Sequence, residues 1–303
     1  MKIYTELNNE HKNLSLALGF FDGVHIGHKE VIRKAVSYAR ENGLKSAVVT
    51  FSSHPAEKFN KNFEGYVMPP AERFEYFEKL GVDYCWALDF EKLTHVSAEN
   101  YIKAILVQSF APKAITSGFN HHFGKNREGS TELLKELSLR YGYNYFEIPP
   151  VLINNVTVSS SIVREFIQCG DIKNLNKFLG HDFLIKGNVQ TGEKIASKLG
   201  FKTANLNYPQ KCTKLKFGVY GVNLNFDGTL YKGIANFGVK PTFCPNIPYH
   251  EPVLEVHILD FNNDIYNQNV TVDFKKFIRP EKKFNSCDEL INQIKADIAT
   301  AKR

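Results

Sequence analysis

Strand-type and helix-type patterns alternate along the first 180 residues, and this alternation stops near residue 181. The apolar run 14–21 ends at a glycine-rich turn, residues 28–41 follow with helical spacing, and 45–51 is the next apolar run. Further helical patterns lie at 71–80, 97–110 and 131–141, and further apolar runs lie at 82–88, 113–117 and 145–148. Strands that alternate with helices form parallel sheets. The first part therefore predicts a parallel α/β sheet covered on both faces.

Beyond residue 181 six short β-type runs follow one another without intervening helices, separated by Gly, Asn, Asp and Pro. This pattern predicts a small closed antiparallel β-barrel. Ser286 and Glu289 have the spacing of a capping box, which predicts a C-terminal helix packed on the barrel. The apolar stripe of this helix comprises Leu290, Ile291, Ile294 and Ile298. We expect two domains, residues 1–182 and 183–303.

Composition excludes several classes of protein. The 303 residues are 43% hydrophobic, enough for two packed cores. The chain begins with polar residues and contains no run of 18 apolar residues, so neither a secretory signal nor a membrane span is expected. Its 5 cysteines are scattered without a CxxC pair, which favours reduced thiols in the cytoplasm. The net charge of +6 is not gathered in basic stripes, so we expect no nucleic-acid partner.

The segment GFFDGVHIGH at residues 19–28 joins a predicted strand to a predicted helix. Gly19, Gly23 and Gly27 permit tight turns and close approach of the backbone to a ligand. His28 lies at the expected start of the helix, where free N–H groups favour phosphate, and His25 can reach the same polyphosphate. Two histidines without cysteine or carboxylate partners make a poor zinc site. Taken alone, the segment is equally typical of a βα turn whose histidines cap the helix.

In its strand–turn–helix context this segment resembles the HxGH nucleotidyltransferase superfamily. Three further segments follow in order: TFSSHP at 50–55, GFNHHFG at 118–124 and SSSIVR at 159–164. Together the four resemble the GxFDGxHxGH, TFxxHP, GxNFxFG and ISSTxxR motifs of the prokaryotic riboflavin kinase/FAD synthetase family. Serines and an arginine at a helix start also suit phosphate binding, although the serines alone would indicate an N-cap.

The resemblance implies His25, His28 and Arg164 as catalytic residues of adenylyl transfer. It implies that the nucleotide-binding residues of this domain are Gly19, Phe20, Asp22, Gly23, Gly27, Asn120, Ser160 and Ser161. The third motif departs from the family at His121 and His122, where Phe and Arg or Thr are usual. Without other ligand-type partners this pair indicates a solvated loop rather than a metal site.

The segment GNVQTGEKIASKLGFKTANL at 187–206 resembles the riboflavin kinase signature GxVxxGxxxGRxLGxPTAN. The resemblance implies that Thr203 and Asn205 hold the magnesium–nucleotide complex, which suits their hard oxygen atoms. It further implies Glu255 as catalytic base and Arg279 as a flavin-binding residue. The implied nucleotide-binding glycines are Gly187, Gly192 and Gly200. The chain departs from the signature at Ala196, Ser197 and Lys202.

Strand alternation around Glu255 places Leu254, Val256 and Ile258 on one face and Glu255, His257 and Leu259 on the other. From the residue alone Glu255 points to solvent or to a ligand, and only the family resemblance favours the ligand.

The motifs predict a bifunctional enzyme that phosphorylates riboflavin to FMN and adenylylates FMN to FAD. Its ligands would be riboflavin, FMN and ATP, with Mg²⁺ as cofactor and no membrane partner; the oligomeric state stays open. One alternative is a monofunctional FMN adenylyltransferase with a weak flavin-binding barrel. Another is a flavin-binding regulatory protein without catalysis, although such a protein needs no general base.

Overall fold

The computed structural model describes the whole chain except residues 9, 61–62, 191–202, 240–251, 262 and 303. Its internal contacts divide the chain into two compact units, Met1–Ser160 and Ser161–Arg303. Within the described ranges, no helix combines the length and the apolar character that a bilayer crossing requires.

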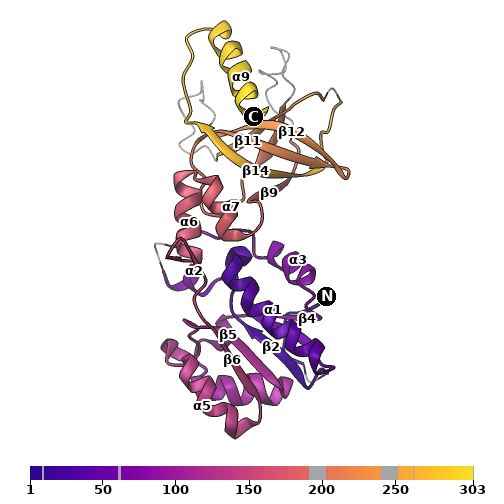
Figure 1. The fold of residues 1–303 in the computed structure, drawn as a ribbon, viewed down its shortest axis with the longest axis vertical. Helices are drawn as coiled ribbons and strands as arrows, with labels where there is room; N and C mark the ends of the chain where they lie inside the picture. The colour runs from indigo at the N-terminus through magenta and orange to yellow at the C-terminus, as the bar shows by residue number, and fades with distance from the viewer. Residues whose placement is uncertain (9, 61–62, 191–202, 240–251, 262, 303) are drawn as a thin grey trace. The chain divides into compact units, whose positions relative to one another are not determined.

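The first unit is built on a six-stranded parallel sheet in the order β1-β4-β3-β2-β5-β6 (Figure 1). Its strands are β1 (Lys2–Tyr4), β2 (Leu14–Leu18), β3 (Lys45–Phe51), β4 (Tyr84–Leu88), β5 (Ala114–Gly118) and β6 (Asn144–Ile148). From β2 the chain proceeds to β3 on one side and later to β5 on the other. The order therefore reverses between β2 and β5, and in open α/β sheets ligands bind beside such a reversal, at the carboxyl ends of the strands.

Helices cover both faces of this sheet, as predicted. They are α1 (Ile26–Glu41), α2 (Pro55–Phe59), α3 (Glu72–Lys79), α4 (Ala98–Asn100), a π-helical segment (Tyr101–Gln108) and α5 (Thr131–Tyr141). Leu16 of β2 belongs to a core cluster with residues of the π-helical segment and α5. Its neighbour Ala17 belongs to a second cluster with α1 and α3. Successive residues of one strand thus enter opposite cores, because side chains alternate across a sheet.

A local hydrogen bond moves the start of helix α1 away from the sequence expectation. Helix α1 begins at Ile26 rather than at residue 28, because His25 caps it: the backbone N of His28 donates to His25 Nδ1 at 3.2 Å.

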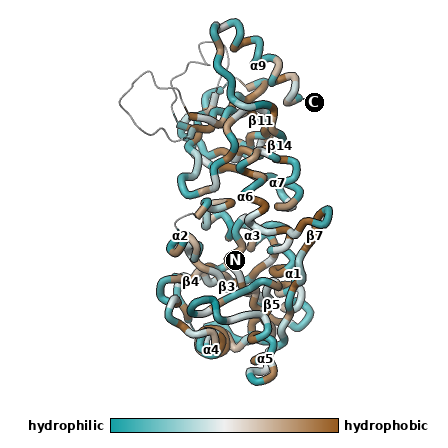
Figure 2. Tube along the Cα trace, turned by 90° about the vertical axis from the view of Figure 1, so that its left-hand side faces the viewer, coloured by the Kyte–Doolittle hydropathy of each residue, from teal (hydrophilic) through white to brown (hydrophobic). Residues whose placement is uncertain are grey.

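A short hairpin of β7 (Leu152–Ile153) and β8 (Val156–Thr157) was not predicted. Its turn residues Asn154 and Asn155 have φ of 51° and 64°, as hairpin turns require. Figure 2 shows the apolar character of β7, and Leu152 is 56% exposed.

The second unit contains a six-stranded antiparallel sheet in the order β10-β13-β12-β11-β14-β9 (Figure 1). Its strands are β9 (Leu184–Asn188), β10 (Thr203–Asn207), β11 (Gly218–Phe226), β12 (Thr229–Gly238), β13 (Val253–Ile258) and β14 (Asn269–Arg279). A bridge between Gln190 and Asn205 links its two edges, so the sheet is nearly closed. The predicted barrel is confirmed.

The predicted C-terminal helix is α9 (Cys287–Lys302), and Ser286 caps it. The backbone N of Glu289 donates to Ser286 Oγ at 3.2 Å, while Glu289 accepts from the backbone N of Asn285 at 3.1 Å. The four residues of the apolar stripe are half-buried. Among the residues of α9 whose burial the structure describes, Asp297 is the most buried, at 2% exposed, and its partner is Arg279 of β14.

Two helices precede the barrel, α6 (Ser160–Cys169) and α7 (Ile172–Leu179). Asn176 of α7 joins the helix to the barrel: its Nδ2 donates to the Phe274 carbonyl at 2.9 Å, and its Oδ1 accepts from the backbone N of Phe183 at 2.8 Å. The backbone N of Lys216 donates to the Ile167 carbonyl of α6 at 3.2 Å. These contacts explain why the second compact unit starts at Ser161. The predicted functional boundary between 182 and 183 stays a prediction.

A fragment of residues 183–303 is expected to fold, but with an unfolding free energy at least about 2 kcal/mol below that of residues 161–303. The shorter fragment loses both Asn176 hydrogen bonds and the apolar surface that α7 covers. Urea denaturation followed by circular dichroism measures the difference. Asn176→Ala within 161–303 should reproduce part of the loss. Equal stability of the two fragments would show that α6 and α7 contribute nothing to the barrel.

Candidate functional site

The turn after β2 lies at the reversal of strand order and has an unusual backbone. Phe21, Gly23 and Val24 have positive φ of 60°, 76° and 40°. A Cβ on Gly23 would lie 2.5 Å from Val67 Cγ1, so both its φ and its surroundings require glycine. Asp22 is 2% exposed, and its two carboxylate oxygens accept from the backbone N of Val67 at 3.1 Å. The turn is therefore a rigid, preshaped element.

This turn brings His25 and His28 together. Their imidazole rings are stacked, with centroids 3.5 Å apart and planes 17° apart. His25 is 5% exposed and His28 is half-buried. Because His25 Nδ1 accepts the capping hydrogen bond, the proton of the neutral ring lies on Nε2, where it can donate to an anion. The helix-capping and the phosphate-binding interpretations of the HxGH segment are therefore compatible, because the capping hydrogen bond of His25 also orients its Nε2–H donor.

The predicted serines and arginine lie at the start of α6. Ser160 Oγ donates to the Asp22 carbonyl at 3.1 Å, so this hydroxyl is tied to the turn after β2. Ser161 and Arg164 belong to the second compact unit, and Arg164 is 8% exposed. Their predicted roles in nucleotide binding and catalysis stay predictions.

The loop after β5 carries the third motif beside the same reversal of strand order. Asn120 is exposed, and its Oδ1 lies 3.6 Å from the position that a Cβ of Gly118 would take. The His121 ring is stacked on that of Phe123, with centroids 5.7 Å apart. Burial, together with the nearby His122, lowers the pKa of His121 to about 4, so this imidazole is neutral near pH 7. His122 Nδ1 lies 3.2 Å from the Gly129 carbonyl.

An aromatic cluster stands at the ends of β2 and β3. The His54 ring meets the edge of Phe20 at 4.5 Å and stacks on Phe63 at 5.3 Å, and Phe63 contacts Tyr66 at 5.2 Å. The Tyr66 hydroxyl donates to Glu57, and burial followed by this bond raises the pKa of Tyr66 to about 12. His54 also caps α2, since its Nδ1 accepts from the backbone N of Ala56 at 2.9 Å. These rings offer stacking surface beside the turn.

Arg73 of α3, which the sequence analysis missed, holds the ends of these strands together. Its guanidinium is fully buried and donates to the carbonyl of Phe20, to the Phe51 carbonyl at 2.9 Å and to Thr50 Oγ1 at 3.3 Å. It also lies 3.9 Å from the centroid of the Phe20 ring. Burial lowers the pKa of Arg73 to about 10, and nearby Asp22 opposes this shift, so the group stays charged at neutral pH. An arginine on an amphipathic helix gives no sequence signal that distinguishes it from a surface residue.

In the barrel, strand register brings the predicted kinase residues together. Asn205 of β10 and Asn236 of β12 both lie directly opposite Glu255 of β13. Thr203 lies opposite His257, and both share this face of the sheet. The predicted alternation is observed, because Leu254, Val256 and Ile258 are buried whereas Glu255 and His257 are half-buried. Leu259, just beyond the strand, is also buried, at 7% exposed.

Asn205 is 7% exposed, and its Oδ1 has no hydrogen-bond partner among the residues that the structure describes. A buried acceptor without a partner is costly, so it marks a position where a ligand can bind. Together with Thr203 it provides two oxygen donors close to Glu255.

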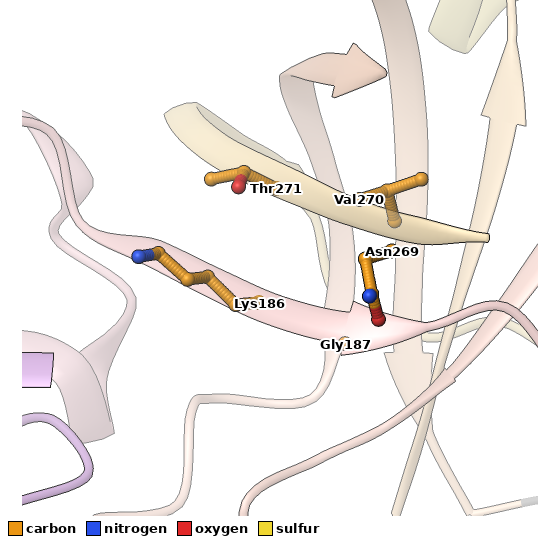
Figure 3. A pocket seen from close by; sticks show the side chains of 5 residues that line it. All are labelled: Lys186, Gly187, Asn269, Val270 and Thr271. Carbon is orange, nitrogen blue, oxygen red and sulfur yellow. The ribbon is translucent and has the colours of Figure 1, made fainter. Parts of the chain in front are cut away.

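Gly187 of β9 lines a shallow hollow of about 340 Å³ with Lys186, Asn269, Val270 and Thr271 (Figure 3). A Cβ on Gly187 would lie 3.0 Å from Leu206 Cδ2, so a larger residue here would require the Leu206 side chain to shift. Gly192 and Gly200, and the departures at Ala196, Ser197 and Lys202, lie outside the described residues.

Arg279 is engaged by α9. Its Nη2 donates to Asp297 Oδ2 at 2.8 Å and its Nε to Oδ1 at 3.0 Å, while Gln293 Nε2 donates to the same Oδ1 at 3.0 Å. The remaining Nη1 donates to the Pro280 carbonyl at 3.0 Å. The pair ties β14 to α9, and the predicted flavin-binding role of Arg279 stays a prediction.

A parallel α/β unit with paired histidines at the reversal of its strand order, together with a barrel that carries a Thr–Asn–Glu face, defines a two-domain nucleotide-dependent transferase. Residues 7–162 match the FAD synthetase family and residues 179–303 match the riboflavin kinase family.

Curated relatives match the chain along nearly its whole length. A bifunctional riboflavin kinase/FMN adenylyltransferase of Bacillus subtilis (strain 168) is 33% identical over 295 residues, 96% of this chain and 92% of the relative. The enzyme of that name from Haemophilus influenzae is 34% identical over 308 residues, 100% of this chain and 98% of the relative. The chain belongs to the bifunctional riboflavin kinase/FMN adenylyltransferase family, and the predicted family is confirmed.

A solved structure from Streptococcus pneumoniae, described as a macrolide-efflux protein, has a TM-score of 0.87 and 30% identity, and covers 98% of this chain and 96% of its own. That description belongs to the matched protein. The likeness supports the fold observed for this chain.

Replacing Arg73 by Lys is expected to lower the free energy of unfolding by about 2–4 kcal/mol, because the donors of an ammonium sit on one nitrogen and cannot span the acceptors that Nη1 and Nη2 of the guanidinium reach. Urea denaturation measures the loss, and hydrogen exchange should show faster exchange of the amides in the turn after β2. Arg140→Lys is the matched control, because Arg140 makes an exposed ion pair with Glu99. Equal stability of the two variants would show that Arg73 does not hold the turn.

Proposed function

We propose that this chain phosphorylates riboflavin to FMN in the barrel and adenylylates FMN to FAD in the α/β unit, with ATP as the donor in both reactions. The observation that supports this proposal is that each unit has its own set of polar site residues on its own scaffold. The α/β unit holds the His25–His28 pair, and the barrel holds Thr203, Asn205 and Glu255 on one face.

In the kinase reaction Glu255 accepts the proton of the riboflavin 5′-hydroxyl as that oxygen attacks the γ-phosphate of ATP. The half-buried position of Glu255, with Asn205 and Asn236 opposite it on the two neighbouring strands, supports this role: the residue is partly enclosed by polar neighbours and still reachable. Phosphoryl transfer needs little covalent chemistry from the protein, so positioning and charge stabilisation supply most of the catalysis.

Thr203 and Asn205 fit Mg²⁺. The buried Asn205 Oδ1 has no hydrogen-bond partner within the described ranges, and Thr203 adds a hydroxyl on the same face. Hard oxygen donors of this kind suit Mg²⁺, which usually keeps several waters and substrate phosphates as further ligands. When bound, Mg²⁺ would neutralise charge on the phosphates of ATP.

In adenylyl transfer the FMN phosphate attacks the α-phosphate of ATP and pyrophosphate leaves. The nucleophile is already an anion, so no general base and no covalent enzyme intermediate are needed. His25 and His28 donate to the charge that develops on the leaving pyrophosphate at the N-terminus of α1, and Ser160, which is hydrogen-bonded to the turn after β2, positions the nucleotide. The roles of Ser161 and Arg164 in this reaction stay predictions. The aromatic cluster of Phe20, His54, Phe63 and Tyr66 provides stacking surface for a flat ring of either substrate.

His28→Ala is expected to reduce FAD formation from FMN and ATP by about 10²–10³-fold, the usual loss for one charge-stabilising donor. FMN formation from riboflavin should stay near wild type, because that chemistry belongs to the barrel. Chromatographic separation of FMN and FAD measures both rates. His95→Ala is the matched control, since His95 is exposed. Equal loss of both activities in His28→Ala would contradict two separate sites.

Glu255→Gln preserves the shape of the side chain and removes the base. Riboflavin phosphorylation is expected to fall by about 10²–10⁴-fold, while FAD formation from supplied FMN persists. Asp260→Asn, an exposed carboxylate just beyond β13, is the control and should leave both rates unchanged. Wild-type protein that makes FAD from FMN but no FMN from riboflavin would identify the monofunctional alternative. Protein that binds flavin and makes neither product would identify the regulatory one.

A further inference from the structure

The loop between Phe123 and Gly129 holds two consecutive non-glycine residues in the left-handed region. Asn126 has φ of 55° and Arg127 has φ of 60°. Asparagine adopts this conformation readily, whereas arginine does so rarely, because its Cβ crowds the backbone. A loop that needed only the turn would be more stable with glycine at position 127.

Surrounding contacts impose this conformation. Phe123 and Gly129 exchange two backbone hydrogen bonds of 3.2 and 2.9 Å, which close the base of the loop. The backbone N of Lys125 donates to the Val96 carbonyl at 2.7 Å, and Glu128 Oε1 accepts from the backbone N of Ala98 at 2.9 Å. The loop after β5 is thus fastened to the loop after β4, and the strain at Arg127 is maintained by structure on both sides.

The strained arginine lies in a loop that follows the carboxyl end of β5, at the end of the sheet from which the turn of His25 and His28 also starts. The loop leaves the carboxyl end of β5, which pairs with β2, and β2 leads directly into the turn of His25 and His28. Arg127 is exposed, and within the part of the chain that the structure describes no carboxylate pairs with its guanidinium. The carboxylate of the neighbouring Glu128 accepts the hydrogen bond from the backbone N of Ala98.

We propose that Arg127 is a substrate-binding residue whose guanidinium binds a phosphate group in adenylyl transfer. The proposal rests on the adenylyltransferase function proposed above. A planar fork of N–H donors can bind two phosphate oxygens at once, which glycine or asparagine at this position cannot do. The phosphate belongs either to FMN or to the triphosphate of ATP.

Substitutions that relieve the strain separate the side chain from the backbone. Arg127→Gly keeps the left-handed turn and is expected to raise the midpoint of thermal unfolding, by roughly 2–4 °C at most, while lowering kcat/KM of FAD formation by about 10- to 100-fold. Asn126→Gly is the matched control: it relieves the neighbouring position and should leave FAD formation unchanged. Arg127→Lys keeps the charge without the fork and should recover part of the loss.

Separate measurements of KM for FMN and KM for ATP identify which substrate carries the phosphate that Arg127 binds. A raised KM for FMN at saturating ATP assigns the contact to FMN, and a raised KM for ATP at saturating FMN assigns it to the triphosphate. Wild-type kinetics in Arg127→Gly would overturn the proposal. If that variant unfolds, Arg127→Asn, which tolerates the same φ, provides the same test. Riboflavin phosphorylation, measured in parallel, should be unchanged in every variant. A wild-type protein that makes no FAD would instead contradict the proposed function.

Discussion

The buried guanidinium of Arg73 is the interaction on which the α/β site depends. One fully buried side chain donates to the carbonyl groups of Phe20 and Phe51. A charge in this place is costly to desolvate, and its lowered pKa reflects that cost. The hydrogen bonds offset the cost only with the turn in one conformation, which is why the turn is preshaped before a nucleotide arrives.

The same rigidity extends to the histidines. The turn that Arg73 supports runs through three left-handed residues into the cap of α1, where His25 Nδ1 accepts from the His28 amide. The capping bond fixes the tautomer of His25 and the stacking of the two rings. A site that acts by placing donors around developing charge gains from such preorganisation, because no reorientation is required during the reaction. The loop after β5 follows the same principle, since its contacts with the loop after β4 hold Arg127 in a conformation it would not adopt alone.

The barrel achieves its site by a different route. Register across β10, β13 and β12 places Asn205, Glu255 and Asn236 in one row, and the opposite face of each strand supplies the apolar core. Sheet pairing therefore aligns the polar residues without strained backbone. The ion pair of Arg279 with Asp297 shows the other use of buried charge in this unit, which is to fix the C-terminal helix to the end of β14.

The sequence by itself determined the two scaffolds, and it predicted most of the site residues named above, whose roles stay predictions. Period-2 and period-3.6 patterns fix which face of each element is apolar, and glycine-rich turns followed by histidines have few structural solutions, so the α/β unit, the barrel and the cap at Ser286 were predictable. Only the tertiary structure decided that Arg73 is buried, that Asp297 is buried more deeply than the apolar stripe of α9, and that Arg127 is strained. Each of these three properties depends on which strand end, helix or loop packs against the residue. Contacts between residues far apart in the chain leave no periodic pattern in the sequence, so the sequence could not predict them.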